Sequence, residues 1–182
     1  MRKGDLALLA RPAVALVGAR NASPGACQFA RQLSFELGQM ELSVVSGVAG
    51  GIDTAAHVGS IDSGTVAIIA GGIDVVYSPE SRALQDRIAE RGLLIAEQPL
   101  GTEPRARHFP YRNRVIAGVS AGTVVIEAAP KSGWLITARL AAEAGVRSWL
   151  FQDRHLIRDR VAATSLSGRV QLLCKMHQRL QR

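Results

Sequence analysis

The sequence feature that most constrains the fold is a series of short, uninterrupted apolar runs separated by glycine-rich turns and helical patterns. The runs lie at residues 13–17, 42–45, 66–70, 93–96 and 123–126. Runs of this length are typical of strands covered on both faces in a parallel sheet. Because they alternate with helical segments, they predict an α/β protein with a doubly wound, mainly parallel sheet.

The segments between these runs predict the helices. Ser23 is suited to an N-cap and Pro24 to the first helical position, and this helix should run to about Met40. Asp53 is placed to cap the next helix. The further helices expected are at 54–63, 80–91, 113–120 and 135–144, and residues 97–111, rich in proline and arginine, predict an irregular loop.

The unusual short motifs all follow predicted strands. Parallel strands have their carboxyl ends at one edge of the sheet, where doubly wound proteins bind their ligands. The motifs are Gly18-Ala19-Arg20, Ser46-Gly47, Gly71-Gly72, the arginine-rich loop and the segment from Glu127 to Gly133. The sequence therefore predicts a single functional rim. Its glycines either present free backbone N–H groups to phosphates or only permit tight turns and close packing.

A cluster of arginines indicates that the ligand is anionic. Arg105, Arg107, Arg112 and Arg114 occur without any acidic residue between Arg105 and Ile126. Such a local field suits phosphates. Since Arg112 and Arg114 are two residues apart near a helix start, they should point to different sides, so that one contacts phosphate and the other braces the rim.

Several candidate residues allow two interpretations. Arg20 directly follows a strand, where it either stands at the rim or forms a structural salt bridge. Phe109 and Tyr111 lie beside arginines, a combination that stacks unpaired bases, or they pack the loop down. His57 lies inside a helix and is expected to pack or to cap, whereas His108 is expected to contact the ligand. No catalytic triad, Walker motif or complete dinucleotide-binding motif is present.

The net charge of +7 is not spread evenly along the 182 residues. Residues 147–182 hold eight Lys/Arg and two Asp, whereas residues 1–146 hold fourteen Lys/Arg and thirteen Asp/Glu. Only local clusters of basic residues within 1–146 therefore indicate a nucleic-acid partner. Two cysteines and the absence of a long apolar run predict a cytoplasmic protein without a membrane anchor, metal ion or cofactor.

Five ordered blocks carry a resemblance to a known family. They are VALVGAR at 14–20, SGVAGGIDTAAH at 46–57, GGIDVVYSPE at 71–80, FPYRNRVIAGVS at 109–120 and EAAPKSGWLITARLA at 127–141. In order and spacing the chain resembles the DNA-processing protein A family (DprA, also named Smf). The resemblance implies a Rossmann-like domain that binds and protects single-stranded DNA, helps load the RecA recombinase during natural transformation, and is not an enzyme.

The resemblance also implies which residues contact DNA. Its G-x-R and R-N-R motifs fall on Gly18 and Arg20 and on Arg112, Asn113 and Arg114. The full set expected at the DNA-binding rim is Gly18, Arg20, Ser46, Gly47, Arg107, Phe109, Arg112, Asn113, Arg114, Ser132 and Gly133. Two residues depart from the family pattern, because Gly50 stands where arginine is usual and Trp134 where a small hydroxyl residue is usual.

The C-terminal part departs further from the family pattern. The Rossmann domain is expected at residues 1–146, without the family's small preceding helical domain, and residues 147–182 form a divergent basic tail. We interpret this tail as the product of a frameshift near residue 147, because a shifted frame permits both missing family motifs. The last strand of the sheet should then be lost and homodimerisation impaired. The alternatives are a nucleotide phosphoribohydrolase, whose P-G-G-x-G-T-x-x-E signature is absent, and an inactive remnant of a decayed gene.

Overall fold

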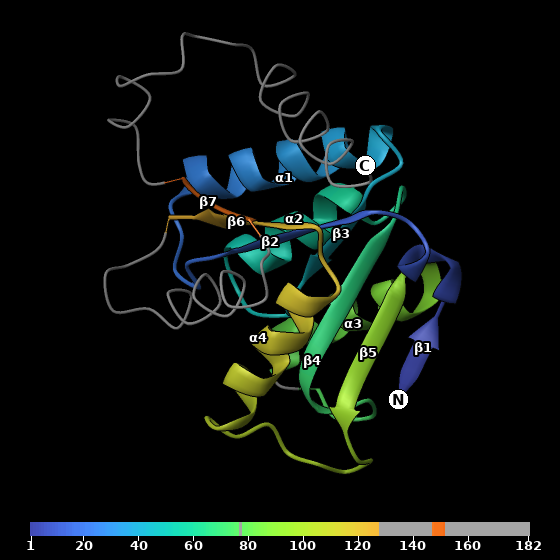
Figure 1. The fold of residues 1–182 in the computed structure, drawn as a ribbon. Helices are drawn as coiled ribbons and strands as arrows, with labels where there is room; N and C mark the ends of the chain where they lie inside the picture. Colours follow the sequence, from blue (N-terminus) through green and yellow to red (C-terminus); the bar gives the residue numbers. More distant parts are fainter. Residues whose placement is uncertain (77, 128–146, 152–182) are drawn as a thin grey trace, which may run out of the picture.

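The computed structural model describes residues 1–76, 78–127 and 147–151. Seven strands form one sheet in the order β1-β5-β4-β3-β2-β6-β7 (Figure 1). All neighbouring strands are parallel except β1, which runs antiparallel to β5. The predicted α/β class and doubly wound, mainly parallel sheet are confirmed. The strands are β1 (Arg2–Gly4), β2 (Ala13–Gly18), β3 (Ser43–Ser46), β4 (Thr65–Gly72), β5 (Leu93–Gln98), β6 (Gly122–Ile126) and β7 (Arg147–Phe151).

Helices cover both faces of the sheet. The helices are α1 (Pro24–Gln39), α2 (Ile52–Ser60), α3 (Pro79–Arg91) and α4 (His108–Gly118), with a short 3-10 helix, η1 (Leu6–Leu9). Alternate residues of β2 face opposite cores: Leu16 packs with α1 and α2, whereas Val17 packs with Ile116 of α4. A third cluster joins α3 to β4 and β5. This alternation explains why the strands read as continuous apolar runs.

The strand order reverses between β2 and β6. From β2 to β5 each new strand is added on one side, and β6 then pairs with the opposite side of β2. In open α/β sheets such a reversal creates a crevice at the carboxyl ends of the two strands. Gly18, at the end of β2, lies opposite Ile126, and a Cβ on Gly18 would lie 2.1 Å from the Ile126 carbonyl oxygen. Glycine is therefore required where these strands meet.

Two helix starts differ from the sequence prediction. Helix α4 begins at His108 rather than near residue 113, because Pro110 falls in its first turn, where a missing N–H is tolerated. Helix α2 begins at Ile52 after Gly51, whose φ of 69° turns the chain into the helix without a side-chain cap. Asp53 is thus not the cap that was predicted, but a buried residue of the first turn. The Ser23 cap and Pro24 start of α1 are confirmed.

The predicted loss of the last strand is wrong. Arg147–Phe151 forms β7, which pairs in parallel with β6 from Gly122↔Arg147 to Ile126↔Phe151. The backbone of this segment therefore completes the sheet edge by pairing with β6. The boundary at residue 147 and the frameshift stay predictions. The helix predicted at 135–144 lies outside the described residues.

Candidate nucleic-acid interface

A partly open pocket lies at the carboxyl ends of the central strands, between β4, the β3–α2 turn and α4. Its apolar wall includes Ile69, Pro104 and Phe109, and its polar groups come from Arg20, Gln85 and Arg112. These residues are far apart in the sequence and meet because parallel strands end on the same edge. The predicted rim therefore exists as a surface that is apolar on its wall and cationic at its mouth.

Phe109 lies beside two arginines. The Arg20 guanidinium carbon lies 4.9 Å from the centre of the Phe109 ring, and that of Arg112 lies 5.8 Å from it. A guanidinium this close to an aromatic face is attracted by the ring, by about 0.5–1 kcal/mol where solvent has access. Arg20 itself is exposed. Phe109 therefore holds Arg20 at the rim, where its charge faces solvent.

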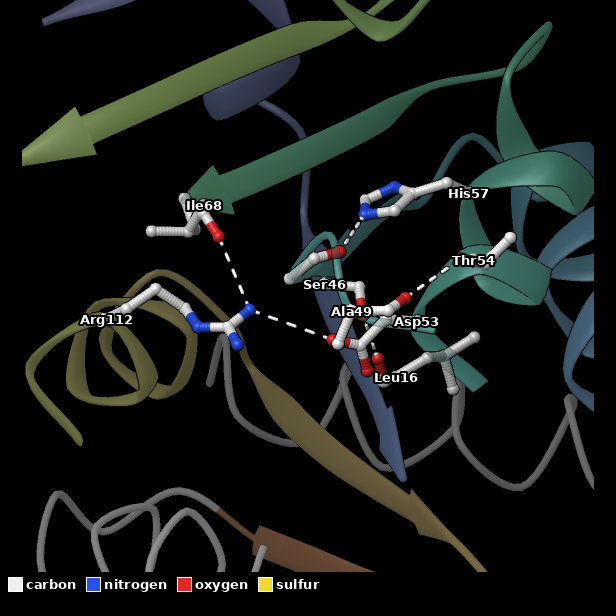
Figure 2. A network of polar contacts seen from close by, with 9 residues as sticks. Leu16, Ser46, Ala49, Asp53, Thr54, His57, Ile68 and Arg112 are labelled. Atoms are coloured by element: carbon white, nitrogen blue, oxygen red, sulfur yellow. Dashed lines mark hydrogen bonds and ion pairs between the residues drawn. The ribbon is translucent and has the colours of Figure 1, made fainter. Parts of the chain in front are cut away.

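Arg112 forms the inner part of the site. Its side chain is only 5% exposed, and it points from α4 towards Ile68 in β4 and Asp53 in α2 (Figure 2). One Nη1 nitrogen donates to the Ile68 carbonyl oxygen at 3.4 Å and lies 3.7 Å from Oδ2 of the fully buried Asp53. Sequence reasoning missed Asp53, because its place at a helix start suggested a cap. Arg112 is thus held by a buried countercharge.

The β3–α2 turn is shaped around this arginine. A Cβ on Gly47 would lie 1.2 Å from Arg112 Nη1, so only glycine leaves room for the guanidinium. The Gly47 carbonyl accepts a hydrogen bond from Nε2 of His57 at 2.5 Å, which leaves Nδ1 to accept from the Thr65 hydroxyl at 2.7 Å. The expectation that His57 packs inside the protein is confirmed, since it is fully buried.

Burial governs the protonation of the inner residues. It raises the pKa of Asp53 to about 6, and the nearby Arg112 guanidinium only partly opposes this effect. Burial also lowers the pKa of His57 to about 4, with Arg112 acting in the same direction. The Arg112 pKa is lowered by burial and by repulsion from Arg20, and raised by Asp53. At neutral pH the inner site therefore contains a neutral imidazole and one buried ion pair.

The remaining arginines lie on the outer side of the rim. Arg114 is exposed and donates from Nη2 to Glu97 Oε1 at 2.7 Å. Arg112 and Arg114 thus point to different sides of α4, as their spacing predicted. Arg107 is exposed, and its Nε donates to Nε2 of the buried His108 at 3.3 Å. His108 therefore supports Arg107 from within the protein and does not itself lie at the surface.

The predicted site residues separate into three groups. Arg20, Phe109 and Arg112 meet at the pocket, and Arg107 and Arg114 lie on its outer side. Four others are buried: Gly18, Gly47, Asn113, and Ser46, whose hydroxyl donates to the Leu16 carbonyl at 2.6 Å. Ser132 and Gly133 lie outside the described residues. Among the described salt bridges, none pairs Arg20 or Arg107 with an acid.

This fold and site define a Rossmann-like α/β protein with a cationic rim at the reversal of strand order. The family model for DNA recombination-mediator protein A matches residues 1–174. The chain belongs to that family, and the resemblance read from its sequence blocks is confirmed. The described helices include none that is both long and apolar enough to cross a bilayer.

Two relatives illustrate the place of the chain in this family. DNA processing protein DprA of Streptococcus pneumoniae is 43% identical over 145 residues, which are 79% of this chain and 51% of the relative. The crystal structure of that species' protein has a TM-score of 0.80 at 38% identity, covering 93% of this chain and 59% of the other. The structure of DNA processing protein A from Helicobacter pylori, a protein with a single-stranded DNA binding mode, has a TM-score of 0.87 at 25% identity. The match covers 96% of this chain and 86% of the H. pylori chain. The chain spans about half the length of the curated relatives it matches, or less.

Proposed function

We propose that this protein binds single-stranded DNA at the rim formed by Arg20, Phe109 and Arg112. The observation that carries the proposal is the position of the Arg20 guanidinium over Phe109, at the mouth of a pocket where the strand order reverses. Membership of the recombination-mediator family and the DNA binding mode of the H. pylori relative support the same ligand.

The contacts available at this rim favour the DNA backbone over base identity. Arg20 offers an exposed planar donor to a phosphate, while Arg112 supplies positive charge from a fixed buried position. The apolar wall and the edge of Phe109 offer surface to an unpaired base. Binding of this kind depends strongly on salt and little on sequence. Direct recognition of individual bases is not part of the proposal.

Membership of the family supports a proposal for the biological role. We propose that the protein protects incoming single-stranded DNA in the cytoplasm and helps load a RecA recombinase during natural transformation. It acts as a binding protein and not as a nucleotide phosphoribohydrolase; release of a free base from a nucleotide would contradict this assignment. Failure of the purified chain to fold would instead favour a remnant of a decayed gene. The predicted divergent tail should impair self-association. Light scattering of the purified chain measures its oligomeric state.

The rim is tested by replacing Arg20. We expect Arg20→Ala to weaken binding of a fluorescent oligothymidine by about tenfold and to reduce the salt slope by about 0.7, the value for one lost phosphate contact on a single strand. Fluorescence anisotropy at several salt concentrations measures both quantities. Arg87→Ala, which removes an exposed arginine from α3, is the matched control and should leave both unchanged. Equal affinity of the Arg20→Ala variant and wild type would overturn the proposed site.

A further inference from the structure

Helix α4 has a second aromatic residue on its outer side, away from the pocket. Arg107, Tyr111 and Arg114 are separated by four and three residues, so they lie along one face of the helix. All three are exposed, and the side chain of Tyr111 is 58% exposed. The buried residues of α4 are His108, Arg112, Asn113, Ile116 and Ala117. Arg112 and Phe109 therefore lie on the pocket side of α4. The arginines and the tyrosine named above lie on its outer side.

The outer set is strongly cationic. No acidic residue occurs from Arg105 to Ile126, and Arg105 and Arg107 are both exposed. Arg114 is paired with Glu97, but this ion pair is solvent-exposed, with 60% and 41% of the two side chains accessible. An exposed pair of this kind contributes little energy and is screened by salt. A polyanion can therefore compete with Glu97 for Arg114.

An exposed tyrosine between arginines suits one class of partner. A single strand offers unpaired bases, which stack on aromatic rings, and phosphates, which bind guanidinium groups. A double helix offers no free base faces, and an acidic peptide offers no planar ring at regular spacing. The charge of this face is complementary to a phosphate backbone.

We infer that the outer face of α4, formed by Arg107, Tyr111 and Arg114, is a second contact surface for single-stranded nucleic acid. A strand held in the pocket continues over the first turns of α4, where one unpaired base stacks on Tyr111 and the arginines contact flanking phosphates. This inference rests on the proposed function. The additional site lies outside the pocket. Only a strand that is too long to fit in the pocket alone reaches it.

The test compares a short oligothymidine of about 5 nucleotides with one of about 16, spanning the range of site sizes known for single-strand binders. Tyr111→Ala should weaken binding of the long strand at least about fivefold and leave the short strand unchanged. Tyr111→Phe, which keeps the ring, should bind both strands as wild type does. Phe35→Ala, which removes an exposed aromatic ring from α1, is the matched control and should have no effect.

A second variant tests the arginines. Glu97→Gln removes the negative charge that pairs with Arg114 and should strengthen binding of the long strand about two- to threefold, without changing the short one. Unchanged long-strand affinity in Tyr111→Ala, with the short strand still bound, would overturn this inference and leave the pocket intact. Equal weakening of both strands would also overturn it, because Tyr111 would then act on the pocket. Absence of binding to either strand by wild type would overturn the proposed function as well.

Discussion

At the scale of single residues, the site depends on how close Arg112 comes to the β3–α2 turn. The guanidinium occupies the volume that a Cβ on Gly47 would take, and it is the ion-pair partner of a carboxylate with no exposure to solvent. A buried charge that loses its partner destabilises a protein far more than the intact pair stabilises it. The Arg112–Asp53 ion pair therefore depends on the absence of a side chain at Gly47.

We expect Gly47→Ala to destabilise the protein by about 3 kcal/mol, because the new methyl group displaces Arg112 and leaves Asp53 without its partner. The free energy of unfolding in urea measures this loss. Gly50→Ala is the control, since a Cβ there would meet only the Arg20 carbonyl oxygen, at 3.4 Å. Equal stability of the two variants would show that the turn does not depend on this close approach.

Gly50 gives a second prediction, this time about affinity. It is exposed at the rim beside Arg20, and the sequence resemblance leads us to expect an arginine at this position. We expect Gly50→Arg to strengthen binding of single-stranded DNA about threefold and to increase the salt slope by about 0.7. Gly50→Glu should weaken binding. If both variants bind as wild type does, the DNA does not pass over this turn.

The sequence pointed to the arginines that meet at the pocket, including the buried Arg112, but not to the carboxylate beside it. Arg20 and the arginines around Phe109 could be found because they follow strand ends or occur without acids nearby. The role of Asp53 could not be found, because its partner Arg112 is 59 positions away and the contact exists only after β3, β4 and α4 are assembled. Contacts between elements form only when the chain packs, and no local sequence pattern predicts them.

At the scale of elements, α2 carries two buried groups with opposite responses to pH. Asp53 keeps its proton in the folded state up to about pH 6, whereas the unfolded chain releases it near pH 3.8. The folded state binds more protons between these values, so this group makes stability fall as pH rises. His57 is protonated near pH 6.5 when unfolded but only near pH 4 when folded, so it makes stability rise with pH.

These opposing effects should nearly cancel between pH 4 and pH 6.5. For wild type we expect only a small contribution from this pair to the pH dependence of the free energy of unfolding. In Asp53→Asn the effect of His57 remains alone, so stability should rise by about 3 kcal/mol across this range, at about 1.4 kcal/mol per unit of pKa. Urea titrations at pH 4 and 6.5 measure the difference. His57→Gln is the reciprocal variant and should become less stable as the pH rises; the same pH dependence in all three proteins would contradict the account.

Elements with strong local signals were predicted well, and elements made by tertiary contacts were not. The five central strands and α1 follow from apolar runs and the Ser23-Pro24 start. The edge strand β1 was missed because Arg2-Lys3-Gly4 has no apolar pattern and is held by pairing with β5. The early start of α4 was missed because Pro110 suggested a loop, although proline is compatible with a first turn.

At the scale of the whole molecule, the sheet continues past residue 146, where the divergent tail was predicted to begin. Strand β7 extends the sheet beyond β6, so the edge of β6 is paired and not open to other chains. Residues 152–182 still carry seven Lys/Arg against two Asp. Such a segment can bind nucleic acid through charge alone, independently of the rim. We propose that the rim, and not this basic segment, binds DNA.

The most direct test is a fluorescence-anisotropy titration of a 16-nucleotide single strand at several salt concentrations, with the full chain and with a chain that ends at Gln152. The shorter chain keeps β7 and lacks the basic segment. We predict equal affinity and equal salt slope for both chains, and a similar loss in both when Arg20 is replaced by alanine. Binding by the full chain alone, with no effect of Arg20→Ala, would contradict the account and assign the DNA to the basic segment.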